Sequence, residues 1–196
     1  MTYHYKKHME DDFIMKENEN ALASTCNFRD VNPIMMALPY PLTQVREKNQ
    51  AYANLISIDY CGAVSEMSST TQYINHENRL SCDRCPLAKT ILGIAMAEMI
   101  HLQKLGELIF LLGGNINFIA RHRDGRQIMW TPQYLNLREN AKEMLAANIE
   151  GERAAIEQYQ MHIKMINDDC VNAVLARIIQ DEEYHIMVLR AMMKEL

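Results

Sequence analysis

The sequence predicts an all-α protein, a four-helix bundle of two helical hairpins that follows an extended N-terminal tail. Three observations support this fold class. From residue 43 onward the chain is a series of long amphipathic runs. Its seven Gly and five Pro residues lie mostly at the ends of these runs, which favours helices over a β fold with many turns. The same pattern of Glu and His also occurs in both halves of this region. We therefore expect an N-terminal extension, residues 1–42, and a helical domain, residues 43–196.

The first predicted hairpin joins two long helices. The first helix is expected to run from near Thr43 to about Glu77. The second has Pro86 in its first turn, which proline tolerates because the first helical N–H groups have no partner within the helix. This second helix is expected to end at Gly113-Gly114.

The second predicted hairpin follows a crossover through residues 121–125. Thr131-Pro132 is typical of an N-cap and first turn, so the third helix is expected to begin there and to end near Asn167. Asp168 or Asp169 is expected to cap the fourth helix, which continues to the end of the chain. Because the connection is so short, these two helices must be antiparallel neighbours.

The composition excludes several classes of function. The net charge is −5 with both signs mixed, which indicates neither a nucleic-acid partner nor a membrane surface. No run of 18 apolar residues occurs, and residues 1–10 lack the apolar stretch of a signal peptide. We therefore expect a cytoplasmic protein. Segment 32–41, which is rich in Pro and apolar residues, is expected to be extended and to pack on the domain or on a neighbouring subunit.

The five cysteines are not expected to form a disulfide framework. Only Cys82 and Cys85 form a C-x-x-C pair, which is half of a four-ligand zinc site. The simpler interpretation is two thiols in a loop just before a helix. The alternative is a redox pair, because a helix N-terminus lowers the pKa of a thiol.

Two stretches of the helical domain carry the same arrangement of polar residues. In each, a lone Glu is followed seven residues later by Tyr and about thirty residues later by Glu-x-x-His. The first set is Glu66, Tyr73, Glu98 and His101, and the second is Glu152, Tyr159, Glu182 and His185. Two helices with a lone Glu and two with Glu-x-x-His form the inward-facing ligand set of a dinuclear iron or manganese site in a four-helix bundle.

Helix geometry places these residues at one level of the bundle. Glu66 and Glu98 each lie about a dozen residues from the turn between their helices, so both are roughly 18 Å from it. Each acid occupies a seam of apolar residues that faces the core. An ionised carboxylate is costly there unless it is paired or bound to metal, and two divalent ions would cancel four such charges. We therefore predict metal ligands at Glu66, Glu98, His101, Glu152, Glu182 and His185.

Several neighbouring residues have two interpretations. Glu150 and Glu152 are about 200° apart around a helix, so only one faces inward, and the match with the first half favours Glu152. Tyr73 and Tyr159 are either core aromatics or hydroxyl donors to ligand carboxylates, and we take them as candidate catalytic residues. Asp59 either contacts the ligands or lies at the end of the bundle. Three histidines without matching partners, His76, His122 and His162, are expected at the surface.

This arrangement resembles the ferritin-like superfamily of diiron and dimanganese carboxylate proteins, over residues 43–196. Segment 178–185, Ile-Ile-Gln-Asp-Glu-Glu-Tyr-His, is similar to the fourth-helix motif of bacterioferritins, and Gly151-Glu152 is similar to the third helix of rubrerythrins. The resemblance implies two Fe or two Mn ions per chain, and these ligand types do not choose between the metals. It implies terminal or bridging carboxylates at Glu66, Glu98, Glu152 and Glu182, and one nitrogen ligand per metal from His101 and His185.

The chain also departs from these relatives. Rubrerythrins carry a further Glu one turn after the third-helix Glu, where this chain has Ala155. They also append a rubredoxin module, and cage-forming ferritins usually add a short fifth helix, neither of which follows the fourth helix here. A peroxidase of this kind would need an external electron donor. Manganese catalases and their spore-coat relatives are bundles with the same ligand layout.

The resemblance implies three classes of function. The first is a dinuclear-metal oxidoreductase, a rubrerythrin-like peroxidase or a ferroxidase that acts on hydrogen peroxide or on O2 with Fe(II), or else a manganese-catalase-like enzyme. The second is iron binding or storage without turnover. The third is a spore-coat-type protein with a vestigial site. We expect the first, in a homo-oligomer that is a dimer or larger.

Overall fold

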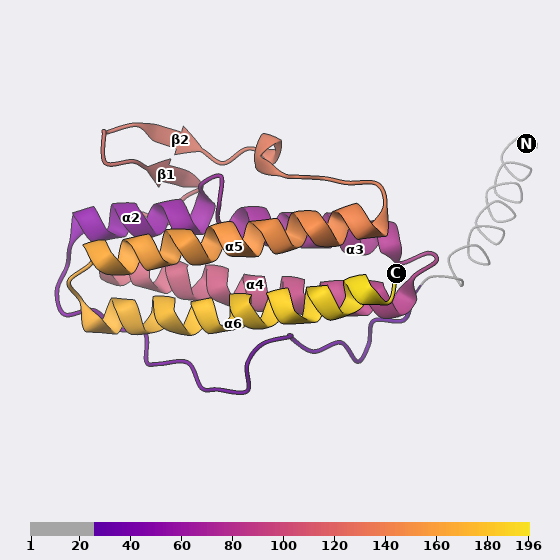
Figure 1. Ribbon diagram of the computed structural model, residues 1–196. Helices are drawn as coiled ribbons and strands as arrows, with labels where there is room; N and C mark the ends of the chain where they lie inside the picture. Colours follow the sequence, from indigo (N-terminus) through magenta and orange to yellow (C-terminus); the bar gives the residue numbers. More distant parts are fainter. Residues whose placement is uncertain (1–25) are drawn as a thin grey trace, which may run out of the picture.

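The computed structural model describes residues 26–196 and confirms the all-α bundle of two helical hairpins (Figure 1). One hairpin consists of a helix in two pieces, α2 and α3, together with α4. The other consists of α5 and α6, which run antiparallel. The bounds are α2 Gln50–Cys61, α3 Glu66–Leu80, α4 Cys85–Leu111, α5 Ala141–Met165 and α6 Asp169–Lys194. The predicted tail residues 1–25 lie outside the described part of the chain.

The first helix differs from the prediction of one continuous helix over 43–77. It begins at Gln50, after the N-cap Asn49, and it is interrupted between Cys61 and Glu66. Gly62 ends α2 in an extended conformation, and a Cβ there would lie 2.6 Å from the carbonyl oxygen of Ile58. The Ser65 hydroxyl then caps α3 by accepting from the N–H of Ser68. The break places Glu66 in the first turn of α3, where the helix N-terminus favours a carboxylate.

The crossover and the start of the third helix also differ from the prediction. Thr131 caps only a short 3-10 helix, Pro132–Tyr134, and α5 begins at Ala141 with Asn140 as its cap. The crossover contains two short antiparallel strands, β1 Ile119–Arg121 and β2 Gln127–Met129, which the sequence analysis missed. Figure 1 shows this hairpin over α2, and the N–H of Arg121 donates to the Ser57 hydroxyl of that helix at 2.9 Å.

The remaining helix ends agree with the capping signals. Pro86 lies in the first turn of α4, and Gly113, at φ 85°, follows its last turn. Asp168, and not Asp169, caps α6 by accepting from the N–H groups of Cys170 and Val171. By length and composition α4 could cross a membrane, but half of its apolar window is buried inside the bundle.

An extended segment, residues 31–41, lies along α4 and α6, and we call it the strap (Figure 1). The N–H of Ile34 donates to the carbonyl oxygen of Gly93 in α4 at 2.9 Å. This close approach requires glycine, because a Cβ at residue 93 would lie 2.7 Å from Cγ1 of Ile34 and 2.9 Å from the carbonyl oxygen of Asn32. The strap therefore packs on its own domain.

The cysteines differ from the simpler interpretation of two free thiols before a helix. Cys85 is the first residue of α4, and it forms a disulfide with Cys26 across 59 residues of sequence. Cys82 is a free, exposed thiol in the turn before α4. Cys61 and Cys170 are also free.

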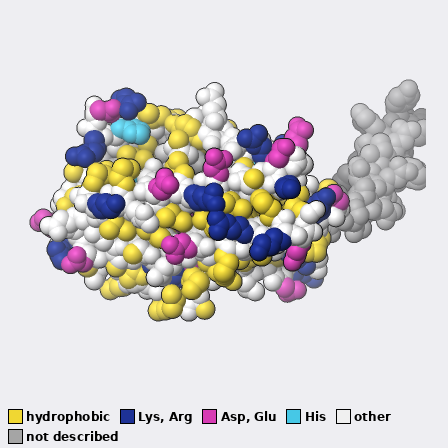
Figure 2. Space-filling model, in the orientation of Figure 1, with side chains coloured by type: hydrophobic (Ala, Val, Ile, Leu, Met, Phe, Trp, Pro, Cys, Tyr) yellow, Lys and Arg dark blue, Asp and Glu magenta, His cyan; other side chains and the backbone are white. Residues whose placement is uncertain are grey.

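Two apolar clusters fill the bundle, one toward each end. One contains Leu105, Leu108 and Leu175, and the other contains Ile94 and Leu189. A layer of buried acidic and histidine side chains lies between these clusters. The face of the molecule that Figure 2 shows mixes acidic and basic side chains. On that face charges of both signs are scattered, whereas the buried layer gathers acidic and histidine side chains.

Gly93→Ala should destabilise the protein by about 1–3 kcal/mol, because the added methyl group overpacks the contact between α4 and the strap. Gly151→Ala in α5 is the matched control. A Cβ there meets open space, so removing a helical glycine should stabilise by about 0.5–1 kcal/mol. Denaturant unfolding measures both changes, and equal effects of the two variants would contradict the close packing of the strap.

Candidate metal centre

The structure brings all six predicted ligands together in the buried layer. Glu66 comes from the first turn of α3 and Glu152 from the middle of α5. α4 and α6 each supply a Glu and the His one turn later, so that both face inward. The four acids and two histidines, Glu66, Glu98, His101, Glu152, Glu182 and His185, are each at most 2% exposed.

These ligands form two half-sites that share two carboxylates. In the first half-site, Nδ1 of His101 lies 3.2 Å from Glu182, 3.5 Å from Glu98 and 3.5 Å from Glu66. In the second, Nδ1 of His185 lies 2.9 Å from Glu182, 3.0 Å from Glu98 and 3.4 Å from Glu152. Glu98 and Glu182 turn one oxygen toward each histidine. This arrangement would suit two metal positions that share Glu98 and Glu182, each with a further Glu and a His of its own.

The outer nitrogen of each histidine is held away from the site. Nε2 of His185 lies 2.8 Å from the carbonyl oxygen of Ile34 in the strap. A carbonyl oxygen only accepts, so Nε2 carries the proton, and in the neutral ring Nδ1 keeps its lone pair for a metal. Nε2 of His101 lies 3.2 Å from Oδ2 of Asp181. Both rings are therefore oriented with Nδ1 toward the centre.

Asp181 is a buried residue of the site that the sequence analysis missed. Besides His101, its carboxylate is 2.7 Å from the hydroxyl of Tyr40, the N–H of Met36 and the guanidinium of Arg177. Burial alone would raise the pKa of Asp181, but hydrogen bonds from His101, Arg177 and Tyr40 outweigh it and lower the pKa to about 2. One signal in the sequence could have indicated Asp181. Arg177 lies four residues before it, so the two side chains share one face of a helix and are able to pair.

Each of the two tyrosines donates a hydrogen bond to a candidate ligand carboxylate on the opposite hairpin. The hydroxyl of Tyr73 on α3 donates to Oε1 of Glu152 on α5, and the hydroxyl of Tyr159 on α5 donates to Oε1 of Glu66 on α3. Each tyrosine thus occupies one oxygen of a carboxylate and leaves the second oxygen, Oε2 of Glu152 or of Glu66, buried without a hydrogen-bond partner. Burial raises the pKa of both phenols well above the usual value, and the nearby carboxylates add to it.

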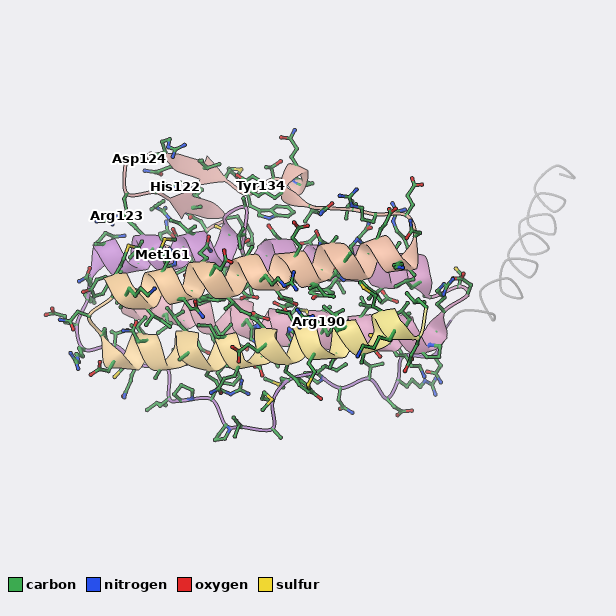
Figure 3. All side chains as sticks on the ribbon, viewed as in Figure 1. His122, Arg123, Asp124, Tyr134, Met161 and Arg190 are labelled. Carbon is green, nitrogen blue, oxygen red and sulfur yellow. A yellow bond between two sulfur atoms is a disulfide. The ribbon has the colours of Figure 1, made fainter. Side chains whose placement is uncertain are left out.

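Two histidines that we expected at the surface are buried instead. His76 bonds Asn148 through Nδ1 at 2.9 Å, and His162 bonds Asp59 at 2.7 Å. His76 lies three residues after Tyr73, and His162 lies three residues after Tyr159. The pattern that the two halves share therefore also includes a histidine. Asp59 therefore pairs with a histidine and does not contact a ligand. His122 is half-buried on the β-hairpin, outside the bundle (Figure 3).

Burial distinguishes the glutamates of the centre from their neighbours on the same helices. Glu152 is 1% exposed, whereas Glu150 and Glu183 are exposed. Ala155, at the position where rubrerythrins carry a further Glu, is buried in the apolar cluster beside the site. The layer therefore holds four glutamates.

The free atoms of this layer fit metal ions. Within residues 26–196, several buried atoms that face the centre have no hydrogen-bond partner: Glu66 Oε2, both oxygens of Glu98, His101 Nδ1, Glu152 Oε2 and Glu182 Oε1. Leaving so many buried polar atoms unpaired would cost several kcal/mol, at about 1–3 kcal/mol each. All of them are oxygen or imidazole nitrogen donors, which suit iron and manganese.

The rubrerythrin family model matches residues 62–193, a range that contains every one of these ligands. The chain belongs to the rubrerythrin family. A search of curated proteins found no match. The family and the two clusters together indicate a dinuclear metal site.

Solved structures share the fold of this rubrerythrin-family chain. A manganese catalase from Anabaena is 22% identical with a TM-score of 0.72, over 82% of this chain and 78% of the catalase. A bacterioferritin from Mycobacterium tuberculosis is 21% identical with a TM-score of 0.61, over 76% and 87%. A bacterioferritin from Rhodobacter capsulatus is 20% identical with a TM-score of 0.59, over 76% and 86%. These similarities confirm a ferritin-like bundle.

Burial and like charges make the site bind protons when no metal is bound. Burial raises the pKa of Glu152 to about 8 and that of Glu66 well above its usual value, and the charges of Glu98 and Glu182 add to both shifts. Burial alone would lower the pKa of the two histidines, but the surrounding carboxylates outweigh it and raise both well above the usual value. Bound protons thus supply the positive charge that metal ions would otherwise supply.

The stability of the metal-free protein should fall as pH rises from 5 to 8. Because the pKa values of these carboxylates and histidines are raised, the folded chain holds more protons than the unfolded chain. The resulting stabilisation is complete at pH values below the pKa of each group in the unfolded chain. It is lost as pH rises through the pKa of that group in the folded chain. For Glu152 this window runs from 4.5 to about 8. Metal affinity grows over the same range, because ligands must release protons. Calorimetry should show a gap in Tm between metal-loaded and metal-free protein that widens with pH. Equal Tm values throughout would contradict the clustering of these acids.

Asp181→Asn should weaken one of the two metal positions by about 10–100-fold, because His101 loses the carboxylate that orients its ring and raises its basicity. Titration calorimetry with Mn²⁺ should then resolve one normal and one weakened binding event. Glu183→Ala, in the same helix but with an exposed side chain, is the control and should bind two ions normally. Equal loss at both positions would contradict separate half-sites.

Proposed function

We propose that this chain is a dinuclear-metal oxidoreductase that reduces hydrogen peroxide, with two Fe or two Mn ions per chain. The observation that carries this proposal is the pair of half-sites that share Glu98 and Glu182. When bound, two adjacent ions would supply redox electrons and positive charge for the cleavage of an oxygen–oxygen bond. The ferritin-like fold and the rubrerythrin family support the same chemistry.

The side chains of the chain would bind the ions, orient the ligands and exclude water. The ligands are at most 2% exposed, so the closed centre suits a substrate as small as a peroxide or O2. Tyr73 and Tyr159 hold protons at Oε1 of Glu152 and Glu66, beside the space where the substrate would lie. We infer that these hydroxyls are the proton donors nearest to the reacting oxygens. A peroxidase reaction also requires an external electron donor.

Specific similarities favour two further functions. A catalase reaction is favoured by the similarity to the Anabaena manganese catalase, and it would need no electron donor. Ferroxidase activity or iron storage is favoured by the similarity to bacterioferritins. A spore-coat-type role with a vestigial site is disfavoured by the complete ligand set. We also propose a cytoplasmic location. A homo-oligomer is supported by exposed Phe110 in the last turn of α4 and by exposed Ile116 and Phe118 in the segment that follows it.

Metal analysis and three assays test the proposal. Purified protein should contain two ions per chain, and anomalous scattering at the iron and manganese edges should show one ion in each half-site. Peroxide loss that depends on a reductant indicates a peroxidase, O2 release indicates a catalase, and Fe(II) consumption with O2 indicates a ferroxidase. A large hollow particle in light scattering would favour storage, and a dimer or hexamer would favour the enzyme.

Glu98→Ala and Glu182→Ala should each reduce turnover at least about 100-fold, because each removes a carboxylate shared by both half-sites and so affects both ions. Glu183→Ala should retain turnover, because that side chain is exposed. Steady-state peroxide consumption and metal content are measured together. Two bound ions and normal turnover in Glu98→Ala would refute the proposed centre.

A further inference from the structure

Three cysteines gather at the end of the bundle where α3 turns into α4. The disulfide joins Cys26 to Cys85, with a Cα–Cα distance of 5.3 Å. Cys82 is a free and exposed thiol three residues before Cys85. The remaining cysteines lie in different elements, Cys61 in α2 and Cys170 in α6. An exposed thiol therefore stands beside the only disulfide found in the described residues.

The turn keeps Cys82 close to the disulfide. The N–H of Ser81 donates to the carbonyl oxygen of Glu77 at 3.0 Å, and the N–H of Arg84 donates to that of Leu80 at 2.9 Å. These bonds curl residues 80–84 tightly before Cys85 begins the helix. Two cysteines in a C-x-x-C spacing at a helix start are able to pair with each other. Cys85 therefore has one disulfide partner that is distant in sequence, Cys26, and a second candidate partner three residues away, Cys82.

The disulfide also fastens the segment that leads into the strap. From Cys26 the chain reaches Ile34, whose N–H bonds Gly93 and whose carbonyl oxygen accepts from His185. Met36 and Tyr40, which follow in the strap, donate hydrogen bonds to Asp181, and Asp181 contacts Nε2 of His101. The covalent link thus anchors one end of a segment whose contacts orient both histidines of the metal centre.

We propose that Cys26, Cys82 and Cys85 form a second redox site, a thiol–disulfide exchange site that controls the anchoring of the strap. The Cys82 thiolate attacks Sγ of Cys85. The Cys82–Cys85 bond forms, the Cys26–Cys85 bond breaks, and the electron pair leaves on the sulfur of Cys26, which takes a proton from solvent. No net oxidation occurs. An external thiol of the glutathione class attacks the same bond and forms a mixed disulfide with one of the two cysteines. A second such thiol then releases that cysteine as a free thiol, and the two external thiols leave as their own disulfide.

Exchange releases residue 26 from α4 and leaves the strap held by its hydrogen bonds and its packing against the bundle, with no covalent link at that end. The strap contact nearest the released end is that of Ile34 with Gly93 and His185, so the second half-site loses support first. A disulfide in a reducing compartment is usually catalytic or redox-sensing, which agrees with the proposed cytoplasmic location. The consequence is a metal centre that releases its ions faster after exchange.

Disulfide mapping tests the exchange itself and requires neither metal nor activity. The full chain is equilibrated with reduced and oxidised glutathione at pH 8, quenched with acid, alkylated, digested and analysed by mass spectrometry. The wild type should give both the Cys26–Cys85 and the Cys82–Cys85 linkage. Cys82→Ser should give only the first, and Cys26→Ser only the second. Cys170→Ser is the matched control and should behave as the wild type. Absence of a Cys82–Cys85 linkage from both the wild type and Cys26→Ser would overturn the proposal.

Metal release tests the consequence for the strap. Mn²⁺-loaded Cys26→Ser should lose metal to a chelator about tenfold faster than Cys170→Ser, a change of the size expected when the support of a ligand is weakened. Cys82→Ser should release metal at the control rate. Hydrogen exchange should show lost protection at Ile34 with α5 and α6 still protected, which separates strap release from global unfolding. Release from Cys26→Ser at the control rate would show that the disulfide does not anchor the strap.

Discussion

Four glutamates buried side by side between two apolar clusters are the constraint on which the rest of this structure depends. Each ionised carboxylate loses water and repels the others, a cost that apolar packing does not offset. The chain responds with two inward histidines, two tyrosine hydroxyls and a pair of apolar clusters that hold the layer in place. Even so, Glu66 and Glu152 retain oxygens without partners. The remaining demand for positive charge is what makes this layer a metal centre and not a structural ion-pair network.

The two halves of the centre are alike in ligands and different in surroundings. On the side of the first half-site, His101 is backed by the carboxylate of Asp181, and His162 pairs with Asp59. On the side of the second half-site, His185 is backed by a neutral carbonyl oxygen, and His76 pairs with a neutral amide. The two carboxylates among these partners therefore lie on one side, and the guanidinium of Arg177 pairs with one of them, Asp181, at 2.7 Å. A carboxylate behind an imidazole makes it a stronger ligand, so the ion at His101 should be the more tightly held.

The strap turns the N-terminal segment into part of the site. The four helices aim every ligand inward, but the partners of both outer histidine nitrogens depend on residues 34–40. Gly93 permits this because α4 presents bare backbone to Ile34 at that point. The centre is thus built by the bundle and oriented from outside it, which explains why a redox site at the bundle end is able to influence the metal ligands without touching them.

The sequence by itself determined the parts of this protein that follow from periodicity. Glu-x-x-His places two side chains on one helix face, and matched distances from each turn bring the four helices' acids to one level, so all six predicted ligands meet in the structure. It also determined most helix ends, because proline, glycine and Asp168 act through local backbone chemistry. The break at Gly62 and Ser65 carried such a signal too, but the amphipathic pattern that continues across the break concealed it.

Only the tertiary structure decided the contacts between residues far apart in sequence. Tyr73 and Tyr159 serve the opposite half-site, which no spacing within one helix reveals. Asp181 becomes part of the site because the strap, some 140 residues earlier, lies against it. The pairing of Cys26 with Cys85 depends on the same long-range path. Periodicity indicates which face of its own helix a side chain occupies. The residue that this side chain contacts depends on how separate segments pack against one another. No single stretch of the chain contains that information.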